Sequence, residues 1–123
     1  MAKKEKKEKK LTKRKLQSMA RTAKRKALQA WSVSVRQRDG NKCLVCGNVE
    51  YIQAHHVIPK ERFPEYMFEI MNGVSLCPSC HKYGSFSFHR HPCWSVLWLQ
   101  ENRPDQYAWV VERSKRPTNV PKT

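Results

Sequence analysis

The stretch that decides the fold runs from residue 54 to residue 81. It begins with AHHVIP at residues 54–59, continues through NGVSL at 72–76 and ends with CPSCH at 77–81. Two further cysteines, Cys43 and Cys46, lie just upstream of it. The segment between residues 43 and 81 thus holds four cysteines and three histidines, the residue types that bind metal ions most readily. We expect the rest of the chain to hold or to orient this segment.

The four cysteines form two pairs, each with two residues between its members: Cys43 with Cys46, and Cys77 with Cys80. This spacing predicts a tetrahedral structural zinc site, with thiolates about 2.3 Å from the ion. Disulfide pairing is the alternative, but the charged N-terminus and the lack of an apolar targeting or membrane-spanning run favour an intracellular, cytoplasmic protein with reduced thiols. Such a clamp would substitute for a large core in a chain that is 39% hydrophobic. Four thiolates close the coordination shell, so any chemistry must use other residues.

The histidines suggest a second site. His55 and His56 lie at the end of a strand predicted over residues 51–57, and His81 directly follows the zinc cysteine Cys80. Successive strand residues face opposite sides, so both could converge only if the strand end before Pro59 twists or widens. More simply, one of the pair would bind a metal ion while the other points toward the substrate water. Each histidine alone could be an ordinary strand or surface residue. Next to a cysteine clamp, the three together favour a second metal ion.

The positive charge is concentrated at the N-terminus. The net charge is +15, and residues 1–30 hold thirteen Lys and Arg but only two Glu. From Leu11 onward, small and apolar residues recur every three or four positions, which predicts a helix that rests this face on the domain and turns its cations toward phosphate. DNA is the expected partner, a solvated helix is the alternative, and the lack of a bulky apolar face argues against a membrane. The candidate nucleic-acid contacts are Lys13, Arg14, Lys15, Arg21, Lys24, Arg25 and Lys26.

The remaining pattern predicts a mixed α+β chain. We expect the first helix to end at Asp39-Gly40, a helical turn to begin at Pro64, and a short strand at 74–76. Helices are expected to start at residue 77, and to span 93–102 and 104–113, with a break over 84–88. The chain divides into a basic arm (1–30), a domain (31–113) and a tail (114–123). Cys93 is predicted to be a small buried residue, and the packing residues of the C-terminal helices are Trp94, Val96, Leu97, Trp98, Leu99, Tyr107, Trp109 and Val110.

Over about residues 31–91 the ordered combination of these motifs resembles the HNH endonucleases of the ββα-metal superfamily. The matching pieces are the two cysteine pairs, HHVIP at 55–59, NGVSL at 72–76, and His81 after Cys80. The resemblance to phage-encoded members extends more faintly into the Trp-rich helices. It implies a small zinc-stapled ββα-metal core between a basic N-terminal helix and C-terminal helices. The implied activity is metal-dependent hydrolysis of DNA phosphodiester bonds, by nicking or double-strand cleavage.

The resemblance also implies roles for individual residues. His56 would be the general base, while His55 and His81 would bind one catalytic divalent ion such as Mg²⁺ or Mn²⁺. Asn72 would fix the loop that orients the base, although an asparagine before glycine is also a plain turn residue. Many family members carry a third histidine four residues after the helix histidine, where this chain has Ser85. His89 is the nearest replacement.

One alternative function is a non-catalytic zinc module that binds nucleic acid. Another is an interaction protein that uses the Trp-rich helices. The sequence leaves open a protein partner or a homodimer, the sequence preference and the biological role, whether packaging, homing, recombination or defence.

Overall fold

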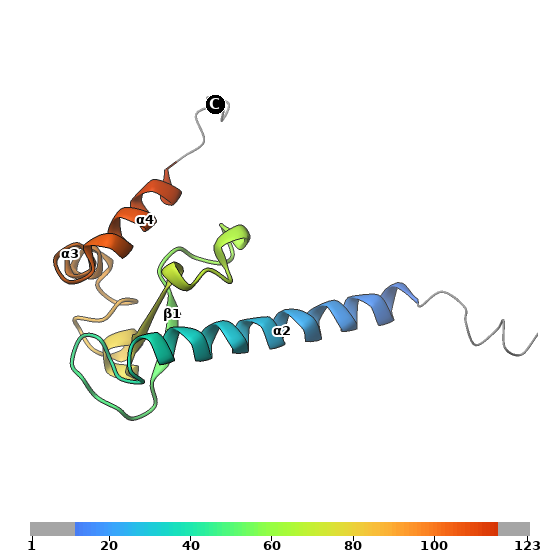
Figure 1. Ribbon diagram of the computed structural model, residues 1–123, viewed down its shortest axis with the longest axis horizontal. Helices are drawn as coiled ribbons and strands as arrows, with labels where there is room; N and C mark the ends of the chain where they lie inside the picture. Colours follow the sequence, from blue (N-terminus) through green and yellow to red (C-terminus); the bar gives the residue numbers. More distant parts are fainter. Residues whose placement is uncertain (1–11, 116–123) are drawn as a thin grey trace, which may run out of the picture.

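A computed structural model describes residues 12–115, so the predictions for residues 1–11 and for most of the tail, residues 116–123, lie outside the described part. Within residues 12–115 the fold combines three α-helices with a small sheet and three short helical turns (Figure 1). Their bounds are α2 Lys13–Arg38, β1 Gln53–His56, η1 Pro64–Tyr66, η2 Ile70–Asn72, β2 Gly73–Leu76, η3 Ser79–Tyr83, α3 Pro92–Asn102 and α4 Pro104–Ser114.

The sheet is an antiparallel pair with β1 beside β2, in a register that places His55 opposite Val74 and His56 opposite Gly73. All four residues of β2 are buried, whereas β1 is half-buried. The core forms around β2 from six buried residues. These are Cys43, Val74, Leu76, Cys77, Phe88 and Leu99. Two zinc-site cysteines thus belong to the core itself, as expected for a domain too small to rely on a large hydrophobic interior.

The C-terminal turns of α2 pack against the sheet. Trp31 and Val35 are the buried residues of this helix, and they approach the backbone of Gly73 closely. A Cβ atom at Gly73 would lie 2.5 Å from Val35 Cγ2 and 2.7 Å from Trp31 Cζ2. The missing side chain of Gly73 therefore lets α2 sit directly on β2, opposite His56.

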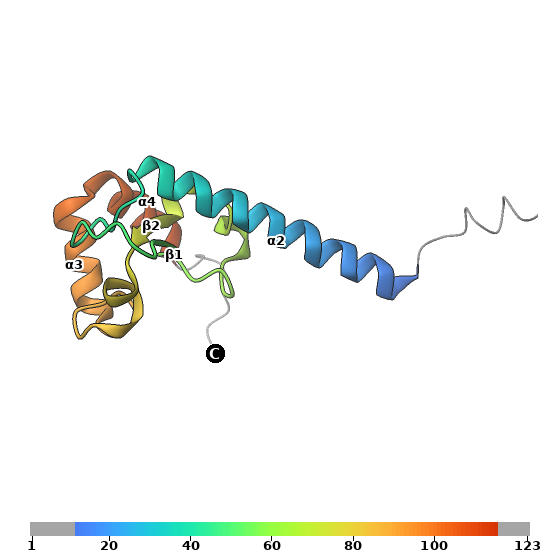
Figure 2. The ribbon, with the colours of Figure 1, turned by 90° about the horizontal axis from the view of Figure 1, so that it is seen from below.

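The N-terminal part of α2 does not pack on the domain, so the prediction that its small-residue face rests there is wrong. Leu16 and Met19 are about half exposed, and the alanines that continue their stripe to Ala27 are exposed as well. Figure 2 shows this part of the helix projecting beyond the folded domain. The period of the stripe predicted the helix correctly, but periodicity cannot show whether a partner surface lies within reach.

A buried ionic network joins α2 to the sheet and to α4. Asp39 is only 5% exposed and accepts hydrogen bonds from the Arg38 guanidinium at 2.8 and 2.9 Å and from the Ser75 N–H at 3.0 Å. Arg103 approaches the same carboxylate at 3.3 Å. Gln106 of α4 adds bonds to the carbonyls of Met71 and Gly73. Because Asp39 ends the helix and meets the sheet, it fixes the angle at which α2 leaves the domain.

Helices α3 and α4 confirm the predicted C-terminal pair, but three of their residues are more exposed than predicted. Leu99 is buried, and the rings of Trp94, Trp98 and Tyr107 pack against the core. In contrast, Val96 and Leu97 are 52% and 58% exposed. Cys93 is also exposed. Helix α3, which carries these three residues, is apolar nearly all round, so its sequence could not show which side would meet the core.

Local differences from prediction have backbone causes. The strand begins at Gln53 and not at residue 51, because Tyr51 has a φ of 56°, which breaks an extended run. The segment predicted as a helix from Cys77 forms the π-helical turn η3 instead. This turn ends where Gly84 N–H donates to Ser79 O at 2.8 Å. Within residues 12–115, none of the helices has the length and apolar character needed to cross a lipid bilayer.

Candidate metal centre and active site

The four paired cysteines meet in one cluster, as predicted. Their sulfur atoms all lie within 4.8 Å of one another, and Cys46 Sγ is 3.6 Å from Cys77 Sγ. Four thiolates at about 2.3 Å from a zinc ion would lie about 3.8 Å apart, so the cluster fits tetrahedral zinc. Gly47, with a φ of 79°, lets its N–H turn back to Cys43 O at 2.9 Å and closes the first loop. The second pair follows β2 directly, which ties this loop to the sheet.

Cys77 and Cys80 differ in pKa although burial favours the neutral thiol of both. Burial raises the pKa of the Cys80 thiol, and the neighbouring thiols raise it further. For Cys77, burial also favours the neutral thiol, but hydrogen bonds from the Cys80 backbone N–H and from neighbouring thiols outweigh it and lower the pKa to about 7. A bound cation would favour the thiolate at every position, since the thiolate is the ligand.

Three histidines form a second cluster next to the first. His81 Nε2 lies 3.1 Å from His55 Nδ1 and 3.0 Å from His89 Nε2, and the three ligand atoms lie within 4.8 Å of one another. Ligand nitrogens about 2.0–2.1 Å from an ion and roughly at right angles to each other are about 3 Å apart. The three nitrogens therefore fit one face of a single divalent ion, with the other face left for water or substrate.

The backbone of the loop after η3 explains why His89 joins this cluster. Phe88 N–H donates to Cys80 O at 2.9 Å, and His89 N–H donates to His81 O at 3.0 Å. Gly84 permits the tight reversal, because a Cβ atom there would lie 2.8 Å from Ser79 O. Residues 88 and 89 thus lie beside residues 80 and 81. Ser85, which holds the position of the third histidine in many family members, is exposed on the intervening loop.

A glutamine not predicted from the sequence sets the tautomer of His81. The carbonyl oxygen of Gln53 can only accept, so His81 Nδ1–H donates to Gln53 Oε1 at 2.7 Å and leaves Nε2 unprotonated. Burial, with the charges of neighbouring His81 and His89, lowers the pKa of His55 to about 3. Burial together with His89 and Lys82 lowers the pKa of His81 to about 4. Both rings are therefore neutral at pH 7, the form in which histidine binds metal.

His56 faces the other side of β1 and does not join the cluster. Its ring stacks on Trp31, with ring centroids 3.8 Å apart and planes 6° from parallel. Its Nε2–H donates to Met67 O at 2.9 Å, since a carbonyl can only accept, and this leaves Nδ1 as the basic nitrogen. Burial lowers the pKa of His56, with the Met67 carbonyl opposing part of that effect. The ring is thus held rigidly and is neutral at pH 7.

Asn72 is fully buried and cross-links the loop that carries Met67. Its side-chain oxygen accepts from Ile58 N–H at 2.6 Å, and its amide donates to the carbonyls of Ile58 and Tyr66, each at 3.1 Å. Those bonds hold both ends of the loop over residues 58–71. They support the loop-fixing role that the family resemblance implies more than that of a plain turn residue.

The histidines open into a cleft of about 810 Å³. One wall holds His55, His56, His81 and His89, and the other belongs to α3 and α4. The seven cations predicted to contact nucleic acid lie outside this cleft, and all are exposed on the projecting part of α2. The residues that the sequence prediction missed are Gln53, Trp31 and the wall from α3 and α4. Of these, only Gln53 could have been predicted from the sequence, because it lies two residues before His55 and so on the same face of the strand.

Comparison with known proteins agrees with this geometry. Residues 43–84 match the family model described as HNH endonuclease. The match includes both cysteine pairs, His55, His56, Asn72 and His81, and it ends before His89. No curated protein and no solved structure matched the chain. Over its central segment, residues 43–84, this chain is therefore similar to the HNH endonuclease family.

Proposed function

We propose that the protein is a metal-dependent endonuclease that hydrolyses phosphodiester bonds in DNA. The proposal rests on one observation: the cleft contains three histidines that converge and a fourth that is held separately. His55, His81 and His89 converge within the distances of a single ion, while His56 lines the same cleft but is held apart by Trp31 and Met67. One set suits metal binding, and the remaining ring suits proton transfer.

In this mechanism the attacking water gives its proton to Nδ1 of His56. The water oxygen forms a bond to phosphorus as the bond from phosphorus to the 3′ oxygen breaks, and the departing 3′ oxygen takes a proton from solvent. His56 is suited to this step because it is neutral at pH 7, and its Nε2–H bond to Met67 O keeps the ring oriented. Asn72 contributes indirectly by holding the loop that presents this carbonyl.

The two clusters of metal-binding residues would have separate roles. The four cysteines are a closed structural zinc clamp, which leaves no position for substrate. The three histidines would hold Mg²⁺, Mn²⁺ or another divalent ion, with oxygen atoms of water and phosphate completing the shell. When bound, this ion supplies positive charge beside the scissile phosphate and the departing oxygen.

The projecting part of α2 supports DNA as the substrate. Residues 13–26 contain seven Lys and Arg but no Asp or Glu. Lys13, Arg14 and Lys15 occupy the first turn, where the unpaired backbone N–H groups of the helix already carry partial positive charge. Such an end is electrostatically unfavourable alone and is stabilised by anions. Phosphates along a DNA backbone would supply them without sequence readout.

A supercoiled plasmid assay tests the proposal. Protein stripped of loosely bound metal should nick or linearise the plasmid when Mg²⁺ or Mn²⁺ is added, and His56→Ala should reduce cleavage by at least about 100-fold. The variant should keep its zinc and its affinity for DNA. Loss of DNA binding together with cleavage would instead indicate a folding defect.

His91→Asn is a matched control. The His91 side chain caps α3 by accepting from Trp94 N–H at 3.1 Å, and asparagine serves equally well at such a position. This histidine variant should cleave at the wild-type rate. If wild type is inactive with every divalent ion yet binds DNA in a salt-sensitive way, the chain is a non-catalytic zinc module.

A further inference from the structure

The cleft beside the histidines has two chemically different walls. On the sheet side it carries the histidines with two lysines, Lys60 and Lys82, and one acid, Glu61. On the opposite side α3 and α4 contribute apolar residues, among them Val96 and Val111, which are 52% and 41% exposed. A cleft that only gripped phosphate would not need this apolar wall.

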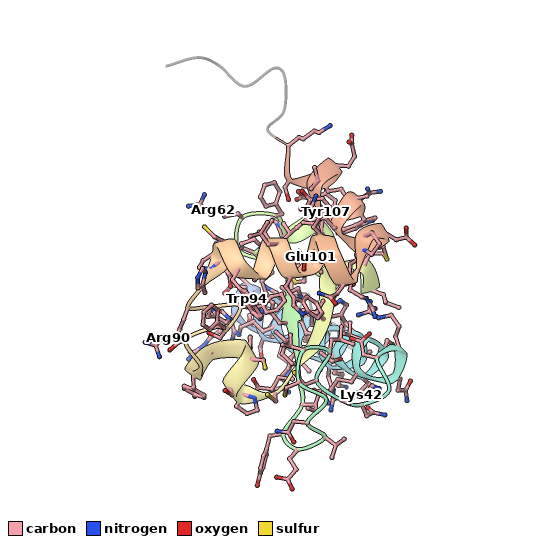
Figure 3. The ribbon with its side chains drawn as sticks, turned by 90° about the vertical axis from the view of Figure 1, so that its left-hand side faces the viewer. Lys42, Arg62, Arg90, Trp94, Glu101 and Tyr107 are labelled. Carbon is pink, nitrogen blue, oxygen red and sulfur yellow. The ribbon has the colours of Figure 1, made fainter. Side chains whose placement is uncertain are left out.

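The occupant of such a cleft must present an anion to one wall and a flat apolar surface to the other. A nucleotide has both, because its phosphate is anionic and its base has an apolar π-face that binds side chains without regard to sequence. Figure 3 shows Arg62 and Arg90 projecting from the same side of the domain as each other. Arg62 directly follows the cleft residue Glu61, and Arg90 directly follows His89, so both cations are sequence neighbours of residues that line the cleft.

The volume of the cleft also limits which ligand it can hold. About 810 Å³ is within the range of about 300–1,000 Å³ found for sites that enclose one small ligand. In a paired duplex each base is covered by its stacked and paired neighbours and has no free face for the apolar wall. We propose that this cleft binds an unpaired nucleotide next to the scissile phosphate, so that the enzyme acts preferentially on single-stranded or locally unpaired DNA. This inference rests on the nuclease function proposed above.

The substrate preference can be measured directly. Three oligonucleotides of the same sequence are compared with Mg²⁺ or Mn²⁺: a full duplex, a duplex with a central mismatched bubble, and the single strand. The bubble and the single strand should be cut at least about tenfold faster than the duplex, the range expected for one base contact. Cleavage of the full duplex at an equal or higher rate would overturn the inference.

Variants on the apolar wall test the contact itself. Val96→Ser combined with Val111→Ser removes apolar surface without adding charge, and partial exposure of both residues limits the effect on folding. The single-stranded rate should fall about tenfold, and by clearly more than the duplex rate. Leu97→Ser is the matched control, because Leu97 is 58% exposed on the same helix but does not line the cleft. Equal effects of the control and the double variant would contradict the proposed site.

Binding separates this inference from the proposed function. With Ca²⁺ in place of Mg²⁺, fluorescence anisotropy measures affinity for labelled single-stranded and duplex oligonucleotides without turnover. If none of the DNA substrates is cut, the nuclease function fails, but tighter binding of the single strand that is lost in the Val96/Val111 variant would still establish the cleft as a nucleotide site. Equal binding of both forms by wild type would refute it.

Discussion

Trp31 of α2 and His56 of β1 lie face to face, with ring centroids 3.8 Å apart and planes within 6° of parallel. Trp31 is itself fixed, because its Nε1–H donates to Glu69 O at 2.7 Å and only 6% of the residue is exposed. Since α2 also carries the exposed cations, the helix that would meet DNA packs against the ring that would take the proton. The contact depends on Gly73, which leaves room for Trp31 beside β2.

Trp31 is therefore expected to position His56, the proposed general base. Trp31→Phe keeps an aromatic face but loses the bond to Glu69 O, and should cost about 1 kcal/mol of stability with a fall of a few-fold in kcat. Trp31→Leu should lower kcat at least about tenfold, because the ring of His56 then lacks its stacking partner. Steady-state kinetics should show KM nearly unchanged in both. A change confined to KM would argue against positioning.

Gln53→Ala should weaken binding of the divalent ion at the histidine cluster by about 10- to 100-fold, because His81 loses the acceptor that fixes its tautomer. Titration calorimetry with Mn²⁺ measures this affinity. Gln53→Glu retains an acceptor oxygen and should bind at least as tightly as wild type. Unchanged Mn²⁺ affinity in Gln53→Ala would show that His81 needs no orienting partner.

Cys77→Ser should remove structural zinc and, with it, cooperative folding, since zinc contributes about 10–16 kcal/mol in small zinc domains. The measurements are zinc content by elemental analysis and thermal unfolding by circular dichroism. Cys93→Ser is the matched control, because Cys93 is exposed and lies outside the cluster. The Cys93→Ser protein should match wild type in zinc content and in thermal unfolding. A folded, zinc-free Cys77→Ser protein would mean that the core is sufficient without the clamp.

The ionic network at Asp39 predicts a loss of stability in acid. Burial alone would raise the pKa of Asp39, but hydrogen bonds from Arg38 and Ser75 outweigh it, so the pKa is below its ordinary value. The stabilisation is complete above the unfolded pKa of about 3.9 and is lost as pH falls through the lower folded pKa. Asp39→Asn should lower the free energy of unfolding by about 1–3 kcal/mol at pH 7. Urea unfolding between pH 7 and pH 2 should show a flatter acid dependence for the variant than for wild type.

Neutralising Lys24, Arg25 and Lys26 together to glutamine should weaken DNA binding and reduce its salt dependence. Each lost phosphate contact lowers the slope of log K against log salt by about 0.9 on duplex DNA, or about 0.7 on single strands. Anisotropy at several NaCl concentrations measures the slope. Lys42→Gln, which changes an exposed lysine on the turn after α2, should leave it unchanged. An unaltered slope in the triple variant would identify this part of α2 as a solvated helix.

Much of this protein could be predicted from residue order because its strongest signals are local. Paired cysteines chelate within one short loop, Pro64, Pro92 and Pro104 begin helical segments, and adjacent histidines on a strand face opposite sides by geometry alone. The ordered motif then predicted the HNH family, which the match over residues 43–84 confirms. In contrast, the apolar stripe on α2 and the buried position expected for Cys93 depended on partner surfaces that no local pattern describes.

The site itself was decided by contacts between residues far apart in the chain. His89 joins the cluster because backbone hydrogen bonds fold residues 88 and 89 against residues 80 and 81. Trp31 reaches His56 across 25 positions of sequence, and α3 and α4 supply the second wall of the cleft. Local propensity specifies elements and ligand types, because those depend on neighbours along the chain. Which ring faces which nitrogen depends on how the elements pack, and only the tertiary structure determines that.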